Sequence, residues 1–265
     1  MAYTANQIKN LALQEINHEM IADSDWTDTS NTDIPIINSQ YALAKSVALT
    51  MYQWSWAFKY AKLSTYEYAF VMPGDWDSGT TFFLYTDSSM QIAITDFSYN
   101  DGIKFYADSE SVYLDYTTTG NVQTQVALTG TPNAETNGKY KKAVFLPSDF
   151  LGYLACYTND QLSILADYIT IGDTVFTNSK ELHIKYIAYV DESVFSSEFV
   201  DWFKIFLAQR LNGYLNGDMQ RQQLLTGEEP FYFRKAKNID SKRNKHDSLN
   251  GNPILWVRGK LGGGI

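Results

Sequence analysis

The chain has 265 residues, of which 45% are apolar and 19% are charged, a balance that excludes wholesale disorder. This length allows one large domain or two small ones, each with a buried core. No apolar run approaches the length that spans a bilayer, and the N-terminal residues lack the basic and apolar segments of a secretory signal. We therefore expect a protein without a membrane-spanning helix. The single Cys156 excludes an internal disulfide, and the apolar residues around it favour a buried filler over a reactive thiol.

The formal net charge of −9 is divided unevenly along the chain. From Arg234 to the C-terminus there are eight Lys and Arg against Asp240 and Asp247, a local charge of +6. The preceding 233 residues carry 13 Lys and Arg against 28 Asp and Glu, a charge of −15. An acidic body with a basic tail is typical of a docking arm. It also argues against nucleic-acid binding by the body, because phosphate neutralisation requires clustered basic side chains.

The first 60 residues contain two predicted helices and a predicted strand. Thr4 is a suitable N-cap, and apolar residues then recur at helical spacing as far as Met20. A second helix is expected to begin after Asn38 or Ser39 and to reach Met51. In residues 52–60 aromatic side chains occupy every second position, which is the spacing of one strand face. We favour a buried strand face over a base- or sugar-stacking platform, because no Arg is interleaved.

Residues 66–190 have the pattern of antiparallel sheet, with short β-prone runs separated by turn residues. The predicted strands are 80–85, 90–97, 103–106, 112–116 and 122–128. A helical segment is expected at 159–167. Beyond it, residues 168–171 and 174–177 predict a hairpin around Gly172-Asp173, and 182–190 predict a further strand.

The C-terminal third begins as a helix with a long apolar stripe. Ser193 or Ser196 can cap this helix, and the stripe extends from Phe199 to Leu215. A second helix is expected from about Glu228, with Pro230 in its first turn, where no backbone donor is needed. After Lys242 the chain is too polar for a core and then ends in an apolar patch, which is typical of a segment that a partner covers.

Motifs for catalysis are scarce in this sequence. It has no Gly-rich phosphate loop, no nucleophile elbow and no paired Cys or His at metal-binding spacing. The three His, at 18, 183 and 246, lack the neighbours that a ligand or general base needs. Asp75 and Asp77 around Trp76 imitate a glycosidase pair, but a turn after Pro73-Gly74 is the favoured interpretation. We expect no enzyme, no cofactor and no metal.

Several segments, in their order along the chain, resemble one family. This family is the head-to-tail adaptor of short-tailed bacteriophages, also called tail tubular protein A or the portal-proximal ring protein. The richness in Tyr and Asn is similar to that of the crAss-like group of phages. The segments that carry the resemblance are residues 54–63 (WSWAFKYAKL), 146–151 (LPSDFL), 168–177 (YITIGDTVFT), 186–191 (YIAYVD) and 207–211 (LAQRL), with Tyr232, Ala236 and Asp240 in the last helix.

The separation between Leu63 and Leu146 departs from the family pattern, and two interpretations remain open. Either residues 72–75 are the usual proline motif displaced, or residues 76–140 are an additional β insertion. The resemblance implies an α+β fold with three parts. These are a helical bundle of residues 1–63 and 192–245, an antiparallel β domain of residues 64–191, and an extended C-terminal arm of residues 246–265.

The resemblance further implies a structural virion protein in the tail or neck, assembled in the cytoplasm of the host bacterium. About twelve copies would form a ring under the portal protein and meet the next tail ring or nozzle protein. Genomic DNA would pass through the lumen without sequence-specific binding, and no membrane is involved. The candidate portal-docking residues of the arm are Ile254, Leu255, Trp256, Val257, Arg258 and Lys260, and the candidate basic contacts are Arg234, Lys235, Lys242, Arg243 and Lys245.

Two alternatives remain beside the adaptor. One is a carbohydrate-binding or glycan-processing module on a β scaffold, which would use Trp76 and the nearby carboxylates. The other is a different phage ring or tail-completion protein of similar architecture. Glycan binding that is lost on replacement of Trp76 would favour the module, whereas rings of uniform size would favour the adaptor.

Overall fold

The computed structural model describes residues 3–28, 30–72, 81–87, 89–91, 93–95, 98–99, 104–118, 123–133, 138–162 and 164–243. Over these residues the chain has the expected α+β fold, and none of its helices is both long and apolar enough to cross a membrane. The chain divides into two compact units. The helical unit combines Met1–Phe58 with Ile187–Ile265, and the β unit is Lys59–Tyr186.

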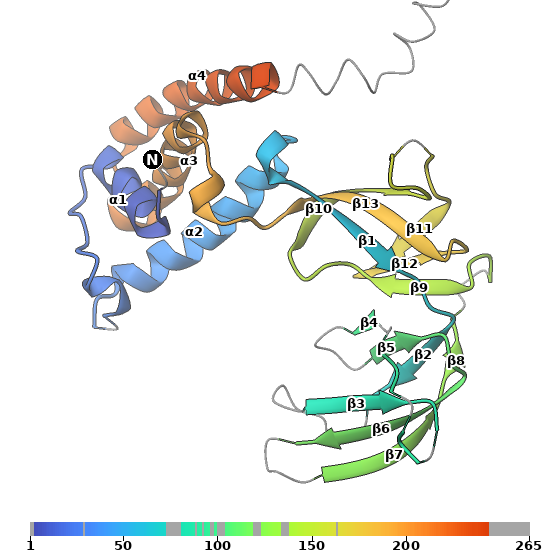
Figure 1. The fold of residues 1–265 in the computed structure, drawn as a ribbon. Coiled ribbons are helices and arrows are strands. Elements are labelled where there is room, and N and C mark those ends of the chain that lie inside the picture. The colour runs from blue at the N-terminus through green and yellow to red at the C-terminus, as the bar shows by residue number, and fades with distance from the viewer. Residues whose placement is uncertain are drawn as a thin grey trace, which may run out of the picture. The chain divides into compact units, whose positions relative to one another are not determined.

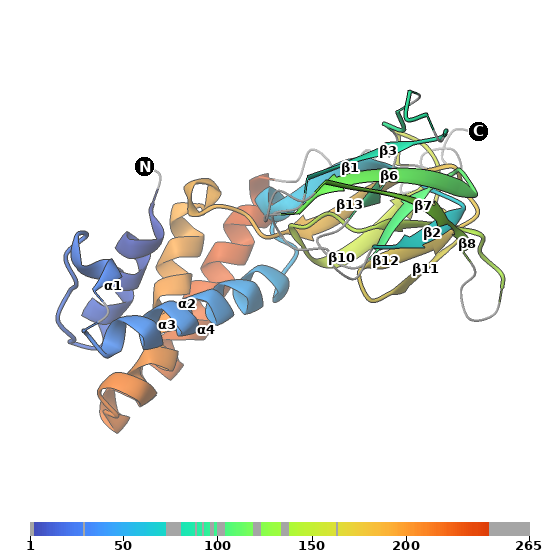
Figure 2. The same ribbon diagram turned by 90° about the horizontal axis from the view of Figure 1, so that it is seen from below.

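Four α-helices build the described part of the helical unit (Figure 1). They are α1 (Ala5–Glu15), α2 (Asp33–Thr50), α3 (Ser197–Leu215) and α4 (Met219–Arg243), accompanied by the short 3-10 helices η1 (Asp25–Thr27), η2 (Ser55–Ala57) and η3 (Glu192–Val194). Figure 2 shows α3 and α4 side by side, with α2 crossing them. Helix α3 is the centre of this packing, because it contacts each of the other three α-helices.

The sequence explains where two of these helices begin. The Thr4 hydroxyl accepts a hydrogen bond from the Gln7 N–H at 3.3 Å, and the Gln7 side chain accepts one from the Thr4 N–H at 3.0 Å. This capping box confirms the predicted start of α1. At α3 the Ser196 hydroxyl accepts from the Phe199 N–H at 3.2 Å, so Ser196 is the cap that the chain uses.

The core of the helical unit is aromatic. The predicted stripe of α3 buries Phe199, Trp202 and Phe203 completely, and Trp54 from the segment after α2 packs among them. The ring centroid of Trp54 lies 4.9 Å from that of Phe199 and 5.7 Å from that of Trp202. Close aromatic pairs of this kind stabilise a core beyond the area they bury.

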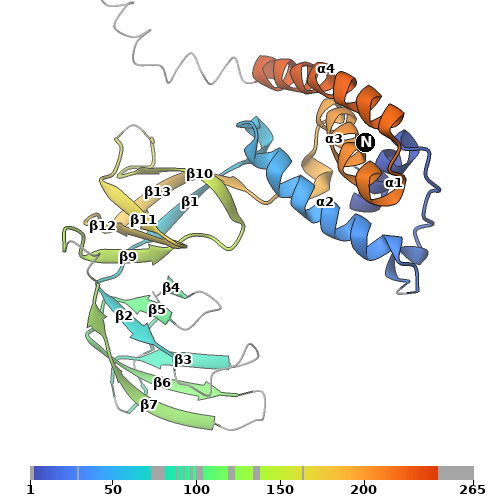
Figure 3. The ribbon, with the colours of Figure 1, turned by 180° about the vertical axis from the view of Figure 1, so that it is seen from behind.

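The described residues of the β unit form four small sheets, which Figures 1 and 3 show from opposite sides. The strand orders are β1-β13-β10, β11-β12-β9, β4-β5-β2-β8 and β3-β6-β7. The strands are β1 (Phe58–Ser64), β2 (Tyr68–Val71), β3 (Thr81–Tyr85), β4 (Ser98–Tyr99), β5 (Lys104–Ala107), β6 (Ser111–Thr117), β7 (Gln123–Thr129), β8 (Thr131–Pro132), β9 (Lys142–Phe145), β10 (Phe150–Tyr157), β11 (Tyr168–Ile171), β12 (Thr174–Thr177) and β13 (Glu181–Ala188). The predicted hairpin is confirmed as β11 and β12, with Gly172 at a φ of +63° in its turn.

Strands β2 to β8 have a hydrophobic core of their own. Side chains from β2, β3, β5 and β6 form it, and β7 adds partly buried residues. The buried members are Phe70, Met72, Leu84, Phe105, Ala107, Val112, Leu114 and Tyr116. The chain enters and leaves this module at one place, because the Asn133 side chain donates to the Tyr66 carbonyl at 2.9 Å and Tyr66 bridges Ala143. Adjacent ends are typical of a module inserted into a host domain.

The predicted strand over residues 52–60 is largely wrong. Tyr52 lies in a turn, residues 55–57 form η2, and β1 begins only at Phe58. The alternating aromatic residues instead run from a turn into β1, and they do not share one face, because Trp54 before η2 is fully buried and Tyr60 in β1 is exposed. The predicted domain boundary after residue 63 falls inside β1.

Two further helices differ from their predicted bounds. Helix α2 begins at Asp33, before the expected Asn38 or Ser39, because Pro35 is tolerated in a first turn. Helix α4 begins at Met219, so Pro230 lies in its interior. The exposed position of Pro230 lets water satisfy the carbonyl that loses its donor. Leu225 is buried and its carbonyl accepts from the Gln209 side chain at 3.0 Å, which fixes the first half of α4 to α3.

Two predicted elements of the β unit are absent where expected. The described residues of 159–167 form turns instead of a helix, and they fold back on β10 through the Ala166 N–H, which donates to the Cys156 carbonyl at 2.9 Å. In the run 90–97, the described residues contribute only an isolated bridge between Ala93 and Tyr85.

Candidate functional site

The structure describes only some of the predicted contact residues. The arm residues Ile254 to Lys260 and the basic Lys245 lie outside the described residues. Arg234, Lys235, Lys242 and Arg243 lie on the last three turns of α4. The structure does not gather them into one patch, because two of them turn back toward α3. Lys235 approaches Asp201 at 3.7 Å and Arg243 approaches Glu198 at 3.4 Å.

The end of α4 is anchored by Asp240, which is only 3% exposed. Its carboxylate accepts hydrogen bonds from the Ser55 N–H at 3.2 Å and from the Ser55 hydroxyl at 2.6 Å. Next to it, the Tyr52 and Ser241 hydroxyls are 2.8 Å apart. Asp240 therefore connects the last helix to the Trp54-Ser55-Trp56 segment. Both belong to the resemblance, and sequence reasoning gave no sign that they meet.

A second junction joins three of the resembling segments inside the β unit. The Asp149 carboxylate accepts a hydrogen bond from the Tyr186 hydroxyl at 2.8 Å and forms an ion pair with Lys59 at 2.5 Å. Lys59 comes from β1, Asp149 from the Leu-Pro-x-Asp segment and Tyr186 from β13. Partial burial would raise the pKa of Asp149, but the hydrogen bonds from Lys59 and Tyr186 hold this pKa below its usual value. Burial, together with the hydrogen bond to the Asp149 carboxylate, raises the pKa of Tyr186.

Charged side chains are also buried in the helical unit. Lys45 of α2 donates to Glu192 of η3 at 2.8 Å, and the Tyr41 hydroxyl donates to the same carboxylate at 2.9 Å. Burial opposes ionisation of Glu192, but the hydrogen bond from Lys45 holds its pKa below the usual value. Lys9 is buried nearby and donates to the Asn38 side chain at 2.7 Å, and burial lowers its pKa. These groups are paired inside the fold, so we interpret them as structural.

Two side chains with reactive groups, His18 and Cys156, have defined surroundings in the fold. His18 lies 3.5 Å from the Asp33 carboxylate. Cys156 is buried, and burial raises its pKa to about 12. In the described part of the chain, no group of three or more His, Cys, Asp or Glu is placed to hold a metal ion. Asp75, Trp76 and Asp77, the candidate carboxylate pair and aromatic residue of the glycan-processing alternative, lie outside the described residues.

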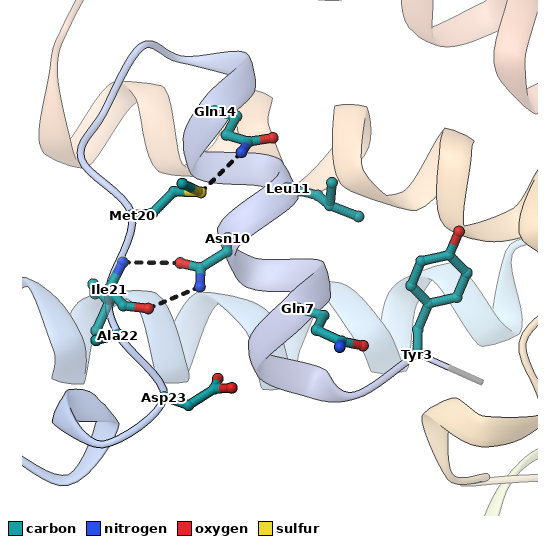
Figure 4. Close-up of a pocket in the computed structure, with 9 residues that line it drawn as sticks. All are labelled: Tyr3, Gln7, Asn10, Leu11, Gln14, Met20, Ile21, Ala22 and Asp23. Atoms are coloured by element: carbon teal, nitrogen blue, oxygen red, sulfur yellow. Dashed lines mark hydrogen bonds between the residues drawn. The ribbon is translucent and has the colours of Figure 1, made fainter. Parts of the chain in front are cut away.

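Sequence reasoning missed a groove on the helical unit, between α1 and the segment that follows it (Figure 4). Its volume is about 640 Å³, and the lining is mostly apolar with amides at its edges. The Asn10 side chain holds the groove in shape, since it donates to the Ile21 carbonyl at 2.8 Å and accepts from the Ile21 N–H at 3.0 Å. Met20 on its wall is 55% exposed. The groove is lined by Tyr3, Gln7, Asn10, Leu11, Gln14, Met20, Ile21, Ala22 and Asp23.

A further surface was also missed, on the outer face of the β3-β6-β7 sheet. The strand register places Phe83 opposite Asp115 and Tyr85 opposite Tyr113, all on the face away from the module core. Phe83 is 64% exposed. The Asp115 carboxylate is held by the Gln123 amide, which donates at 3.0 Å. The result is an aromatic surface with an oriented carboxylate and no Lys or Arg on its three strands.

Comparison with known proteins adds no assignment to these surfaces. No protein-family model matches the chain, and no curated protein matches it in sequence.

Proposed function

We propose that the chain is the subunit of a head-to-tail adaptor ring in a short-tailed bacteriophage. About twelve copies would dock under the portal, seal the filled head and leave a channel for DNA. The observation that carries this proposal is the use of the resembling segments as the junctions of the scaffold. Ser55 meets Asp240 in the helical unit, and Lys59 and Tyr186 meet Asp149 in the β unit.

The charge division supports the same function. An acidic body of −15 would repel the phosphates of DNA in a lumen and let the genome slide. The basic contacts on α4 lead directly into residues 246–265, which carry the apolar Leu255 and Trp256. We assign this arm to the portal, where an aromatic anchor and basic flanks would suit a groove or sheet edge.

The test is assembly on portal rings of the same phage, viewed by electron microscopy. The full chain should add a ring of uniform size to each portal. Deletion of residues 246–265 should leave a folded protein that no longer joins the portal. A chain in which a Gly/Ser sequence of equal length replaces the arm is the matched control, and it should fail in the same way. If either variant joins the portal as well as the full chain does, the arm is not the portal-docking segment. If the full chain does not join the portal, the proposed adaptor function is wrong.

A second candidate function is carbohydrate binding by the β module, and the outer face of β3-β6-β7 favours it. Exposed aromatic rings can stack on the apolar face of a sugar, and a fixed carboxylate can accept hydrogen bonds from its hydroxyls. Titration of the full chain with neutral oligosaccharides tests this candidate. Binding should weaken at least about tenfold for Phe83→Ala and for Asp115→Asn, a change of roughly 1.4 kcal/mol. The control variant is Thr129→Ala, on the same face at the end of β7.

A further inference from the structure

The groove on α1 lies beside an acidic stretch of the helical unit. Residues 10–44 contain six Asp and Glu and no Lys or Arg. Glu15 is neutralised by Lys204 and Arg221, each at 2.9 Å, and Asp33 contacts His18. The other four carboxylates are exposed and form no ion pair within the described residues. These four are Glu19, Asp23, Asp25 and Asp28.

The outer face of α4 carries apolar and basic residues instead of acidic ones. Leu224, Phe231, Lys235, Asn238 and Lys242 are separated by seven, four, three and four residues, so they form one narrow stripe along the helix. All five are exposed, and Phe231 is 60% exposed, although Lys235 also lies 3.7 Å from Asp201 of its own α3. We call these five residues the α4 stripe. It is apolar in its first half and basic in its second, over a length of roughly 27 Å.

The groove and the α4 stripe are complementary in their apolar residues and in their charge. The groove offers apolar Leu11, Met20 and Ile21 for Leu224 and Phe231, and Asp23 begins the run of unpaired carboxylates for Lys235 and Lys242. Gly227 lies between the two apolar residues of the stripe, and nothing within 4 Å of its Cβ position obstructs an approach. The first turn of α4 meets the end of α1, where Arg221 pairs with Glu15, but the groove and the α4 stripe have no residue in common.

We propose that the α4 stripe of one copy of this chain docks in the α1 groove of a second copy. The contact joins two different surfaces of identical subunits, so repetition of it generates a ring when the rotation closes. Closure into a ring rests on the proposed adaptor function, whereas the pairwise contact does not. Opposite charges at the contact select the direction of docking, because stripe against stripe and groove against groove are repulsive.

Disulfide trapping tests the contact between two copies directly. Ala22→Cys places a thiol in the groove, and Gly227→Cys places one within the stripe without displacing a neighbour. The native Cys156 is buried and should not form a cross-link. Under mild oxidation, a mixture of the two full-length variants should form the mixed dimer. Thr226→Cys is the matched control, since it is exposed on the same helix but points away from the stripe.

The expected yield of the mixed dimer is at least about tenfold above that with Thr226→Cys, and it should fall as salt screens the charges. Lys242→Glu in the stripe should abolish the excess, and Asp23→Lys in the groove of the other copy should restore it. Equal yields for the stripe and control thiols would overturn the contact. If rings form on the portal without this cross-link, the contact fails and the adaptor function stands. If the cross-link forms but no ring joins the portal, the adaptor function fails and the contact stands.

Discussion

Asp240 and Ser55 lie 185 residues apart in the chain, and their hydrogen bonds close the helical unit. The carboxylate of Asp240 satisfies both the N–H and the hydroxyl of Ser55, immediately after the buried ring of Trp54. The C-terminal end of α4 is thereby fixed to the connection that leads out of α2. This bond also fixes the point from which residues 244–265 continue.

Replacement of Asp240 should destabilise the helical unit substantially. Asp240→Ala leaves the N–H and hydroxyl of Ser55 without their acceptor in a buried place, which costs about 2 kcal/mol of unfolding free energy. Asp240→Asn keeps one acceptor oxygen and should cost less. Urea unfolding followed by tryptophan fluorescence measures both losses. Asn238→Ala, exposed on the same helix, is the control, and a loss as small as the control's for Asp240→Ala would contradict the role of this carboxylate.

Asp149 should make the β unit sensitive to acid. Its pKa is lowered in the folded state, so its contribution is complete above the ordinary value near 4 and is lost as the pH falls through the lowered folded pKa. The difference in unfolding free energy between the wild type and Asp149→Asn should therefore be largest at neutral pH and shrink below about pH 4. Unfolding curves measured over this range check the effect. The exposed Asp160→Asn serves as control, and a constant difference for Asp149→Asn would contradict the prediction.

Local signals predicted the fold well where local chemistry decides it. Thr4 and Gln7 form their cap within four residues. The apolar stripe of α3 from Phe199 has helical spacing, which puts these side chains on one face that the core can bury. The turn at Gly172 is local too. The aromatic alternation from Tyr52 to Tyr60 wrongly predicted a strand before Phe58. A turn can also place aromatic residues at every second position, with their rings directed toward helices. Trp54 is buried by α3, which lies far away in the sequence.

The functional surfaces were less predictable than the fold. The basic residues of α4 were found from composition, but their ion pairs with Asp201 and Glu198 depend on how α4 packs on α3. The groove was missed because its walls come from two segments that only the fold brings together. Its signal was present in the sequence as the long stretch without Lys or Arg in residues 10–44. The partners of Asp149 lie 90 and 37 residues away, beyond any local pattern.

Cys156 should be inert in the native protein. Burial raises its pKa to about 12, so almost no thiolate exists at neutral pH and the sulfur is covered. A chromogenic thiol reagent should react only at the rate at which the β unit opens, and the rate should rise with urea in step with unfolding. Thr226→Cys supplies an exposed thiol for comparison. Rapid reaction of the wild type in native buffer would show that Cys156 is accessible.

The ion pair of Lys45 and Glu192 should be costly to break from one side only. Lys45→Met leaves the partly buried Glu192 carboxylate without its cationic partner, although the Tyr41 hydroxyl still donates to it, and we expect a loss of about 3 kcal/mol in unfolding free energy. The double variant Lys45→Met with Glu192→Gln removes both charges and should recover part of that loss. Urea midpoints of the two variants give the comparison, with exposed Lys242→Met as control. A double variant that is no more stable than Lys45→Met alone would mean that packing of the lysine stem, and not its charge, stabilises this junction.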